Sequence, residues 1–123
     1  MTKYFFLIFI GFAALGSSLI ESEIIKWNTP LDHNFGTLEQ GKPATHYFEF
    51  KNTSPDALWI DNVRTSCGCT APDWTYEAIE PDSTTQIRII FDAAKTGYFR
   101  KKIMVFVSGQ RKAEKLYIEG TVE

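Results

Sequence analysis

Short runs in which every second residue is apolar follow one another along most of this chain. In one such run Phe48 and Phe50 share a side and Tyr47 lies on the other. A period of two is the pattern of a strand with one buried and one exposed face. Beyond residue 22, no stretch shows the 3.6-residue period of a convincing helix. The pattern therefore predicts an all-β fold.

Turn residues separate these runs at regular intervals. Asn52-Thr53-Ser54-Pro55-Asp56 is a turn by composition, because Asn, Ser and Asp bond their own backbone and Pro restricts φ. We expect strands at residues 24–27 with 35–38, and at 45–52, 58–65, 85–91, 98–108 and 114–122. Pro30 and Gly36 interrupt the first of these, which we expect to form a split edge strand.

Strands of this length and spacing, joined by such turns, predict two packed antiparallel sheets. We expect an immunoglobulin-like antiparallel β-sandwich of about seven strands, with a small closed barrel as the alternative. A chain of 123 residues has room for one domain of this kind. The domain should occupy residues 24–123 and follow a signal peptide.

Residues 1–18 have the order of a secretory signal peptide. Lys3 precedes an apolar run that extends to about Gly16, and the small residues Ser17 and Ser18 follow. The run is shorter than the roughly 20 apolar residues that cross a bilayer. We expect cleavage near Ser17 and a periplasmic or secreted protein; the alternative is that the segment is kept as a membrane anchor.

Composition and charge exclude several classes of protein. Hydrophobic residues make up 44% and charged residues 23%, which is typical of a globular domain rather than of a disordered or multi-span membrane protein. The net charge of −2 comes from 13 basic and 15 acidic residues, and the basic residues are mostly scattered. We therefore expect no nucleic-acid partner.

Signatures of catalysis are missing from the sequence. With His33 and His46 as its two histidines, the chain contains no His-Glu-x-x-His pattern, no Gly-x-Ser-x-Gly elbow and no phosphate-binding Gly-rich loop. We expect a protein that is not an enzyme and that needs no cofactor.

Several local patterns occur together in a definite order. They are Phe35-Gly36, Phe48-x-Phe50-x-Asn52, Ser66-Cys67-Gly68-Cys69-Thr70 with Pro72, Ile79-x-Pro81, Phe91-Asp92, Gly97-x-Phe99-x-Lys101 and Ile118-x-Gly120-x-Val122. This arrangement, over residues 24–122, resembles the bacterial family DUF1573, whose domains are similar to the immunoglobulin-like modules of ASPM, SPD-2 and Hydin. The resemblance implies the sandwich fold and export, and it implies no reaction. Asp82 departs from the family pattern, which usually has Gly there.

The element Cys67-Gly68-Cys69 is the most distinctive part of that resemblance. Its two thiols permit a structural disulfide, for which the chain must bend and Gly68 supplies the conformational freedom. They also permit binding of a soft metal such as copper(I), or redox exchange with a partner. The remaining interpretation is that the cysteines are small buried hydrophobic residues. We favour the structural interpretations.

Five apolar residues fall opposite the inferred core positions. They are Tyr47, Trp59, Met104, Phe106 and Tyr117. If they are contiguous, they form a candidate binding face for a protein or a sugar. The alternative is that they are cross-strand pairs that stabilise the sheets.

The sequence as a whole favours a non-enzymatic, exported interaction or structural module. Its partner is expected to be another envelope or secreted protein. The alternative function is copper binding or redox chemistry through Cys67 and Cys69.

Overall fold

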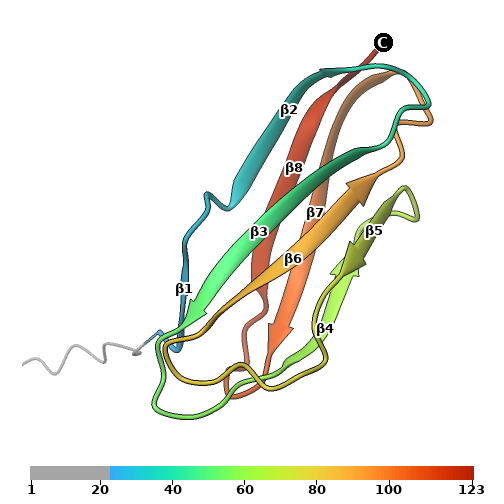
Figure 1. Cartoon of the computed structure of the whole chain (residues 1–123). Coiled ribbons are helices and arrows are strands. Elements are labelled where there is room, and N and C mark those ends of the chain that lie inside the picture. The colour runs from blue at the N-terminus through green and yellow to red at the C-terminus, as the bar shows by residue number, and fades with distance from the viewer. Residues whose placement is uncertain (1–22) are drawn as a thin grey trace, which may run out of the picture.

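Two four-stranded sheets packed face to face make up the domain (Figure 1). The computed structural model describes residues 23–123, and the expected signal peptide lies outside them. The strands are β1 (Ile25–Trp27), β2 (Asp32–Leu38), β3 (Ala44–Asn52), β4 (Ile60–Thr65), β5 (Thr70–Asp73), β6 (Thr84–Phe91), β7 (Gly97–Val107) and β8 (Glu114–Val122). This arrangement confirms the predicted immunoglobulin-like sandwich. Within residues 23–123, no helix is long and apolar enough to cross a membrane.

The first sheet has the strand order β1-β3-β6-β5 and the second β2-β8-β7-β4. The predicted split edge strand is present, with β1 at the edge of the first sheet and β2 at the edge of the second. Because the chain changes sheets there without reversing direction, β2 pairs with β8 in parallel. The expectation of purely antiparallel sheets is therefore wrong at this one pair.

Strand β5 is an eighth strand that the sequence pattern did not predict. It is four residues long, contains Pro72 and pairs with β6 at the edge of the first sheet. Proline lacks the N–H group that a central strand needs, but an edge strand tolerates it. The same proline made the segment look like a connection.

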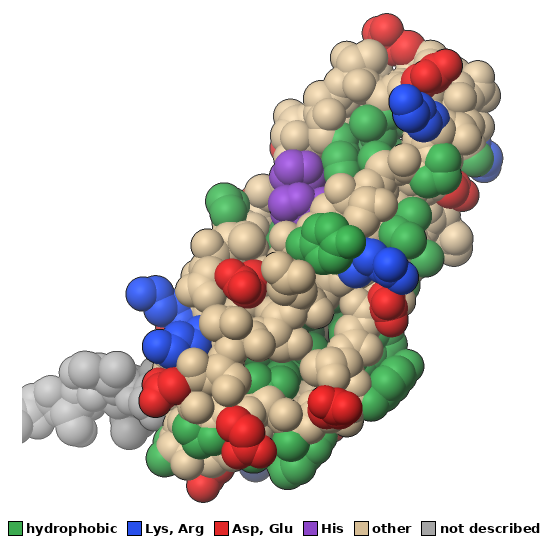
Figure 2. Space-filling model, in the orientation of Figure 1, with side chains coloured by type: hydrophobic (Ala, Val, Ile, Leu, Met, Phe, Trp, Pro, Cys, Tyr) green, Lys and Arg blue, Asp and Glu red, His purple; other side chains and the backbone are tan. Residues whose placement is uncertain are grey.

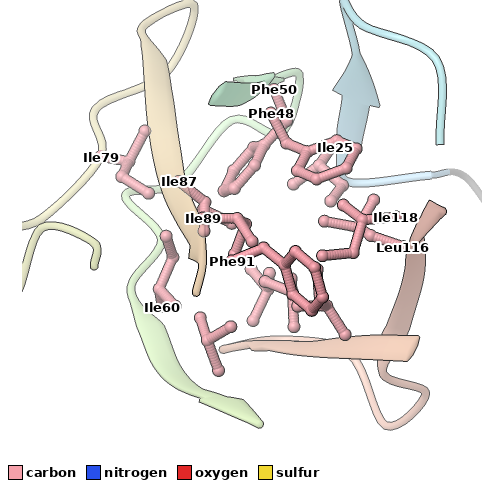
Figure 3. Packing of buried hydrophobic residues seen from close by; sticks show 14 of the residues in the cluster. Ile25, Phe48, Phe50, Ile60, Ile79, Ile87, Ile89, Phe91, Leu116 and Ile118 are labelled. Atoms are coloured by element: carbon pink, nitrogen blue, oxygen red, sulfur yellow. The ribbon is translucent and has the colours of Figure 1, made fainter. Parts of the chain in front are cut away.

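The core lies between the sheets, where the predicted inward faces meet (Figure 3). Its largest fully buried side chains include Phe48, Phe50, Ile87, Ile89, Ile103, Leu116 and Ile118. The expected alternation is confirmed along β3, β6, β7 and β8, where buried and more exposed positions follow each other.

Several of the scattered sequence patterns meet in one place on the second sheet. Gly36, with a φ of +70°, forms a bulge in β2 opposite β8. A Cβ atom at Gly120 would lie 2.9 Å from the carbonyl oxygen of Gly36 and 2.9 Å from the ring of Phe99. The close approach of these groups explains why position 120 is occupied by glycine.

Candidate functional site

Cys67 and Cys69 are joined by a disulfide in the connection from β4 to β5. Their Cα atoms are 5.3 Å apart, which is within the usual range for a disulfide. A tight turn brings them together, and the N–H group of Thr70 donates to the carbonyl of Cys67 at 3.4 Å. The loop thus lies where the chain passes from the second sheet to the first.

Gly68 lies in this turn, as the sequence predicts, but the turn does not use the conformational freedom expected of glycine. Its φ is not in the left-handed region, unlike those of Gly36, Gly41, Gly97 and Gly109. A Cβ atom at Gly68 would meet nothing within 4 Å. The bend comes from the turn itself, so the conformational freedom of glycine is not required there.

A hollow of about 470 Å³ lies beside the disulfide. Its walls come from the disulfide loop, the end of β6, the connection from β6 to β7, and the start of β7. Phe91 and Phe99, stacked with ring centroids 3.9 Å apart, contribute an apolar part of the wall. The charged residues that line it are Asp92, Lys95 and Lys101.

Lys101 occupies an unusual position in this hollow. The residues that alternate with it on the inward side of β7 are Phe99, Ile103, Val105 and Val107, all of them buried. Lys101 is half-buried instead, and its strand partner is the fully buried Ile118. The cation therefore interrupts the inner face at the position where the hollow opens.

The two sulfur atoms have different surroundings. The backbone N–H group of Cys69 donates to Sγ of Cys67 at 3.3 Å. The hydroxyl of Thr70 lies 4.0 Å from Sγ of Cys67 and 3.8 Å from Sγ of Cys69. Cys69 also packs against the hydrophobic core. Both side chains are half-buried and line the hollow.

The histidines and the methionine of the described residues, which could assist two thiols in binding a soft metal, lie elsewhere. His33 and His46 stack on each other with ring centroids 3.6 Å apart, and Met104 faces outward from β7. None of the three lines the hollow beside the disulfide. Within residues 23–123, no group of three or more His, Cys, Asp or Glu side chains is arranged to hold a metal ion.

The histidine stack connects the two sheets. His33 belongs to β2 and His46 to β3, and the pair is visible at the surface (Figure 2). Partial burial lowers the pKa of both imidazoles below the ordinary value of 6.5, and the nearby charge of His33 lowers the pKa of His46 further. Both rings therefore favour the neutral form.

The structure divides the candidate binding face between the two sheets. Tyr47 lies on the outer side of the first sheet, where it pairs with Arg88. Met104, Phe106 and Tyr117 lie on the outer side of the second sheet. Tyr47 is therefore on a different sheet from Met104, Phe106 and Tyr117 and cannot share a binding face with them.

Trp59 extends the group on the second sheet. Its carbonyl accepts from the N–H group of Ser108, two residues beyond Phe106, and its side chain is 46% exposed. Met104 is two residues from Phe106 along β7 and is paired with Lys115, two residues from Tyr117. Met104 and Phe106 thus follow each other along β7, with Tyr117 diagonally placed on β8 at one side and Trp59 before β4 at the other; we call these four residues the outer row.

Cationic side chains accompany the outer row. The guanidinium carbon of Arg64 lies 5.5 Å from the ring centroid of Phe106, and that of Arg100 lies 4.4 Å from that of Tyr117. Arg100 also pairs with Asp32 at 2.8 Å and with Glu119 at 3.5 Å. These contacts hold the arginines in place over the aromatic rings.

Sequence reasoning overlooked Lys101, Arg64 and Arg100 as parts of possible sites. Lys101 carried a usable signal, because it is a charged residue in an otherwise apolar inward series. The arginines carried none, since only the strand register places them over aromatic side chains.

Solved structures with this fold come from very different proteins. A protein of unknown function from Porphyromonas gingivalis W83 matches with a TM-score of 0.68 and 16% identity, over 80% of this chain and 46% of that chain. The ASH/PapD-like domain 7 of human CEP192 matches with a TM-score of 0.68 and 10% identity, over 81% of this chain and 85% of that chain. The Vibrio cholerae VesB protease matches with a TM-score of 0.62 and 13% identity, over 80% of this chain and 32% of that chain.

At these identities the likeness concerns the fold, which is immunoglobulin-like and PapD-like. The chain spans about half of the Porphyromonas protein and a third of the protease chain. No protein of curated function matches the sequence. The family model DUF1573, a protein family of unknown function, matches residues 25–122. This match confirms the resemblance seen in the sequence patterns, and the chain belongs to the DUF1573 family.

Proposed function

We propose that this chain is a non-enzymatic, exported module that binds another envelope or secreted protein through the outer row. The observation that carries the proposal is the row itself: four large apolar side chains on one sheet face, flanked by cations. The signal-like order of residues 1–18 supports export. The missing catalytic signatures in the sequence support a binding role.

The composition of the outer row fits a protein interface. Aromatic residues, methionine and arginine are enriched at the centres of interfaces, where they are buried on binding. Phe106 and Tyr117 each have an arginine held over the ring, so part of the surface is ordered before a partner arrives. Less side-chain freedom is then lost on association.

Charge indicates the kind of partner. Arg64 and Lys115 are the strand neighbours of Met104, and Lys102 is the neighbour of Tyr117. Among the described residues these three cations take part in no ion pair, whereas Arg100 is neutralised by Asp32 and Glu119. We therefore propose a partner surface with an apolar centre and acidic residues around it.

Photo-crosslinking in producing cells tests the proposal with two matched positions. A photoreactive residue replaces Trp59 on the outer row or Tyr47 on the opposite sheet, which are 46% and 48% exposed. We expect position 59, and not position 47, to capture one reproducible acidic envelope or secreted protein. Identical adducts from both positions, or none from position 59, would contradict the proposed surface.

Charge reversal provides the second arm of the test. We expect Arg64→Glu with Lys115→Glu to weaken binding of the captured partner at least about tenfold, mostly through slower association. The same reversal at Lys26 of β1, exposed on the other sheet, serves as the control. Equal losses from both sets of changes would show that general charge, rather than this face, drives binding.

A further inference from the structure

The Cys67–Cys69 disulfide contributes little to the stability of the fold. One residue separates the two cysteines, so the bond closes a very small loop. A loop this small restricts the unfolded chain much less than a disulfide loop of ordinary length does. Position 68 needs no glycine for steric reasons either. The disulfide therefore has only a modest structural role, which leaves its reactivity as the property to explain.

The disulfide is accessible from the hollow beside it. Both cysteine side chains are half-buried and line this space, which measures about 470 Å³. That volume lies in the range of sites that accept small ligands or a few side chains of a partner. Phe91 and Phe99 add apolar surface, so a partner peptide can contact the wall while its thiol approaches the disulfide.

The charges in the hollow favour a thiolate over a thiol. Lys95 and Lys101 line it together with Asp92, whose carboxylate accepts from the N–H group of Ala94 at 3.1 Å. Two lysines and one carboxylate that is already hydrogen-bonded thus line the same hollow. Cations near a sulfur atom stabilise the anionic form, which is both the attacking and the leaving species in disulfide exchange.

We propose that Cys67–Cys69 is a thiol–disulfide exchange site that oxidises a pair of cysteine thiols in a partner protein. This inference does not depend on the outer row. In the first step a partner thiolate attacks Sγ of Cys69, the bond between the two sulfur atoms breaks, and Cys67 leaves as a thiolate. The N–H group of Cys69 already donates to Sγ of Cys67 and stabilises that leaving thiolate.

In the second step the partner's second thiolate attacks the sulfur of the partner's first cysteine, which is bonded to Cys69 in the mixed disulfide. The partner closes its disulfide and Cys69 leaves as a thiolate. Two electrons pass from the partner dithiol to Cys67 and Cys69. The two protons lost by the partner thiols are taken up by solvent or by the new thiolates. The dithiol is the one co-reactant, and one exchange leaves this protein reduced.

A kinetic comparison separates the contribution of the protein from that of the small ring. The oxidised protein reacts with a synthetic dithiol peptide, and alkylation followed by intact mass measures the rate. The reference is the isolated peptide Ser66-Cys67-Gly68-Cys69-Thr70 in its disulfide form. We expect the protein to react at least about tenfold faster. A rate equal to or below that of the peptide would overturn the proposal.

Two lysines provide a matched pair of variants. Lys101→Gln removes a cation from the hollow, and Lys26→Gln removes an equal charge from an exposed position of β1 that does not line the hollow. We expect Lys101→Gln to slow the exchange several-fold and to reduce its sensitivity to salt, with little change for Lys26→Gln. Equal rates for the two variants would contradict the assigned role of Lys101.

Reaction with glutathione tests the order of attack. The trapped mixed disulfide is digested, and we expect mass spectrometry to place the glutathione on Cys69. Glutathione mainly on Cys67 would overturn the proposed sequence of steps.

The double variant Cys67→Ser with Cys69→Ser tests the site as a whole. It should remain folded by circular dichroism, because the small loop adds little stability, and it should lose all exchange, because it has no thiols. Exchange by this variant would rule out the site.

Discussion

Asn52 shows how much a single buried polar residue can organise in this domain. Its side chain is fully buried at the end of β3. The amide group donates to the carbonyls of Asp56 and Ile79, each at 2.8 Å, and its oxygen accepts from both the backbone and the hydroxyl of Ser54. One side chain thus joins the turn after β3 to the segment before β6.

We expect Asn52→Ala to lower the free energy of unfolding by about 3 kcal/mol. The loss is large because the fully buried amide of Asn52 makes four hydrogen bonds, to the turn after β3 and to the segment before β6, and all of them disappear. Ser54→Ala is the matched control and should cost only about 1 kcal/mol, since the amide of Asn52 keeps its bonds. Urea denaturation measures both values. Similar losses for the two variants would show that the network does not depend on Asn52.

Asp82 illustrates a different residue-scale effect. It stands where the family resemblance in the sequence leads us to expect glycine, and it has a φ of +65°. Aspartate tolerates the left-handed conformation better than most residues. Its backbone N–H group donates to the carbonyl of Asn52 at 2.8 Å, so the turn retains its place next to β3.

At the scale of elements, the bulge in β2 and the glycine in β8 depend on each other. The bulge moves the backbone of Gly36 toward β8, and the side chain of Asn34 accepts from the N–H group of Gly36 at 2.7 Å. Gly120 leaves room for that approach, and the ring of Phe99 covers it. Strand β2 can therefore attach in parallel despite its irregular register.

Gly120→Ala should destabilise the domain by about 2 kcal/mol, because its Cβ atom would overlap a backbone oxygen and an aromatic ring. The small gain from restricting the unfolded chain is outweighed. Gly68→Ala meets no atom within 4 Å and should change stability little. Thermal unfolding compares the two variants. An unchanged melting temperature for Gly120→Ala would show that β2 moves aside without loss.

At the scale of the whole molecule, the two sheets are connected by more than the apolar core. His33 of the second sheet stacks on His46 of the first, between the rings of Phe35 and Phe48. The register partners of the two histidines are the fully buried Ile118 and Ile89. The stack therefore has an apolar environment that disfavours charge.

This environment predicts a loss of stability in mild acid. The pKa values of both histidines are lower in the folded state than in the unfolded state, so the unfolded chain binds more protons as the pH falls below about 6.5. Stability should be constant above that pH and decrease below it, until the folded histidines are also protonated. Melting temperatures between pH 8 and pH 5 measure the effect. His46→Gln should flatten the decrease, and an unchanged slope in that variant would contradict this origin.

Much of the fold follows from local patterns in the sequence. Alternation determined which residues of β3, β6, β7 and β8 face the core, because a strand exposes successive side chains on opposite sides. Turn composition determined where most strands end. The same reasoning could not find β5, since its proline carries the local signal of a connection and only pairing with β6 makes it a strand.

The candidate sites depended much more on tertiary structure. The sequence identified Cys67 and Cys69 as chemically distinctive, because their spacing is local. It could not place Lys101 and Lys95 in the same hollow, nor separate Tyr47 from the outer row. Those relations arise when β6 and β7, in different sheets, are brought together by packing of the core. Local patterns determine the faces of strands, whereas contacts between distant segments decide which side chains share a site.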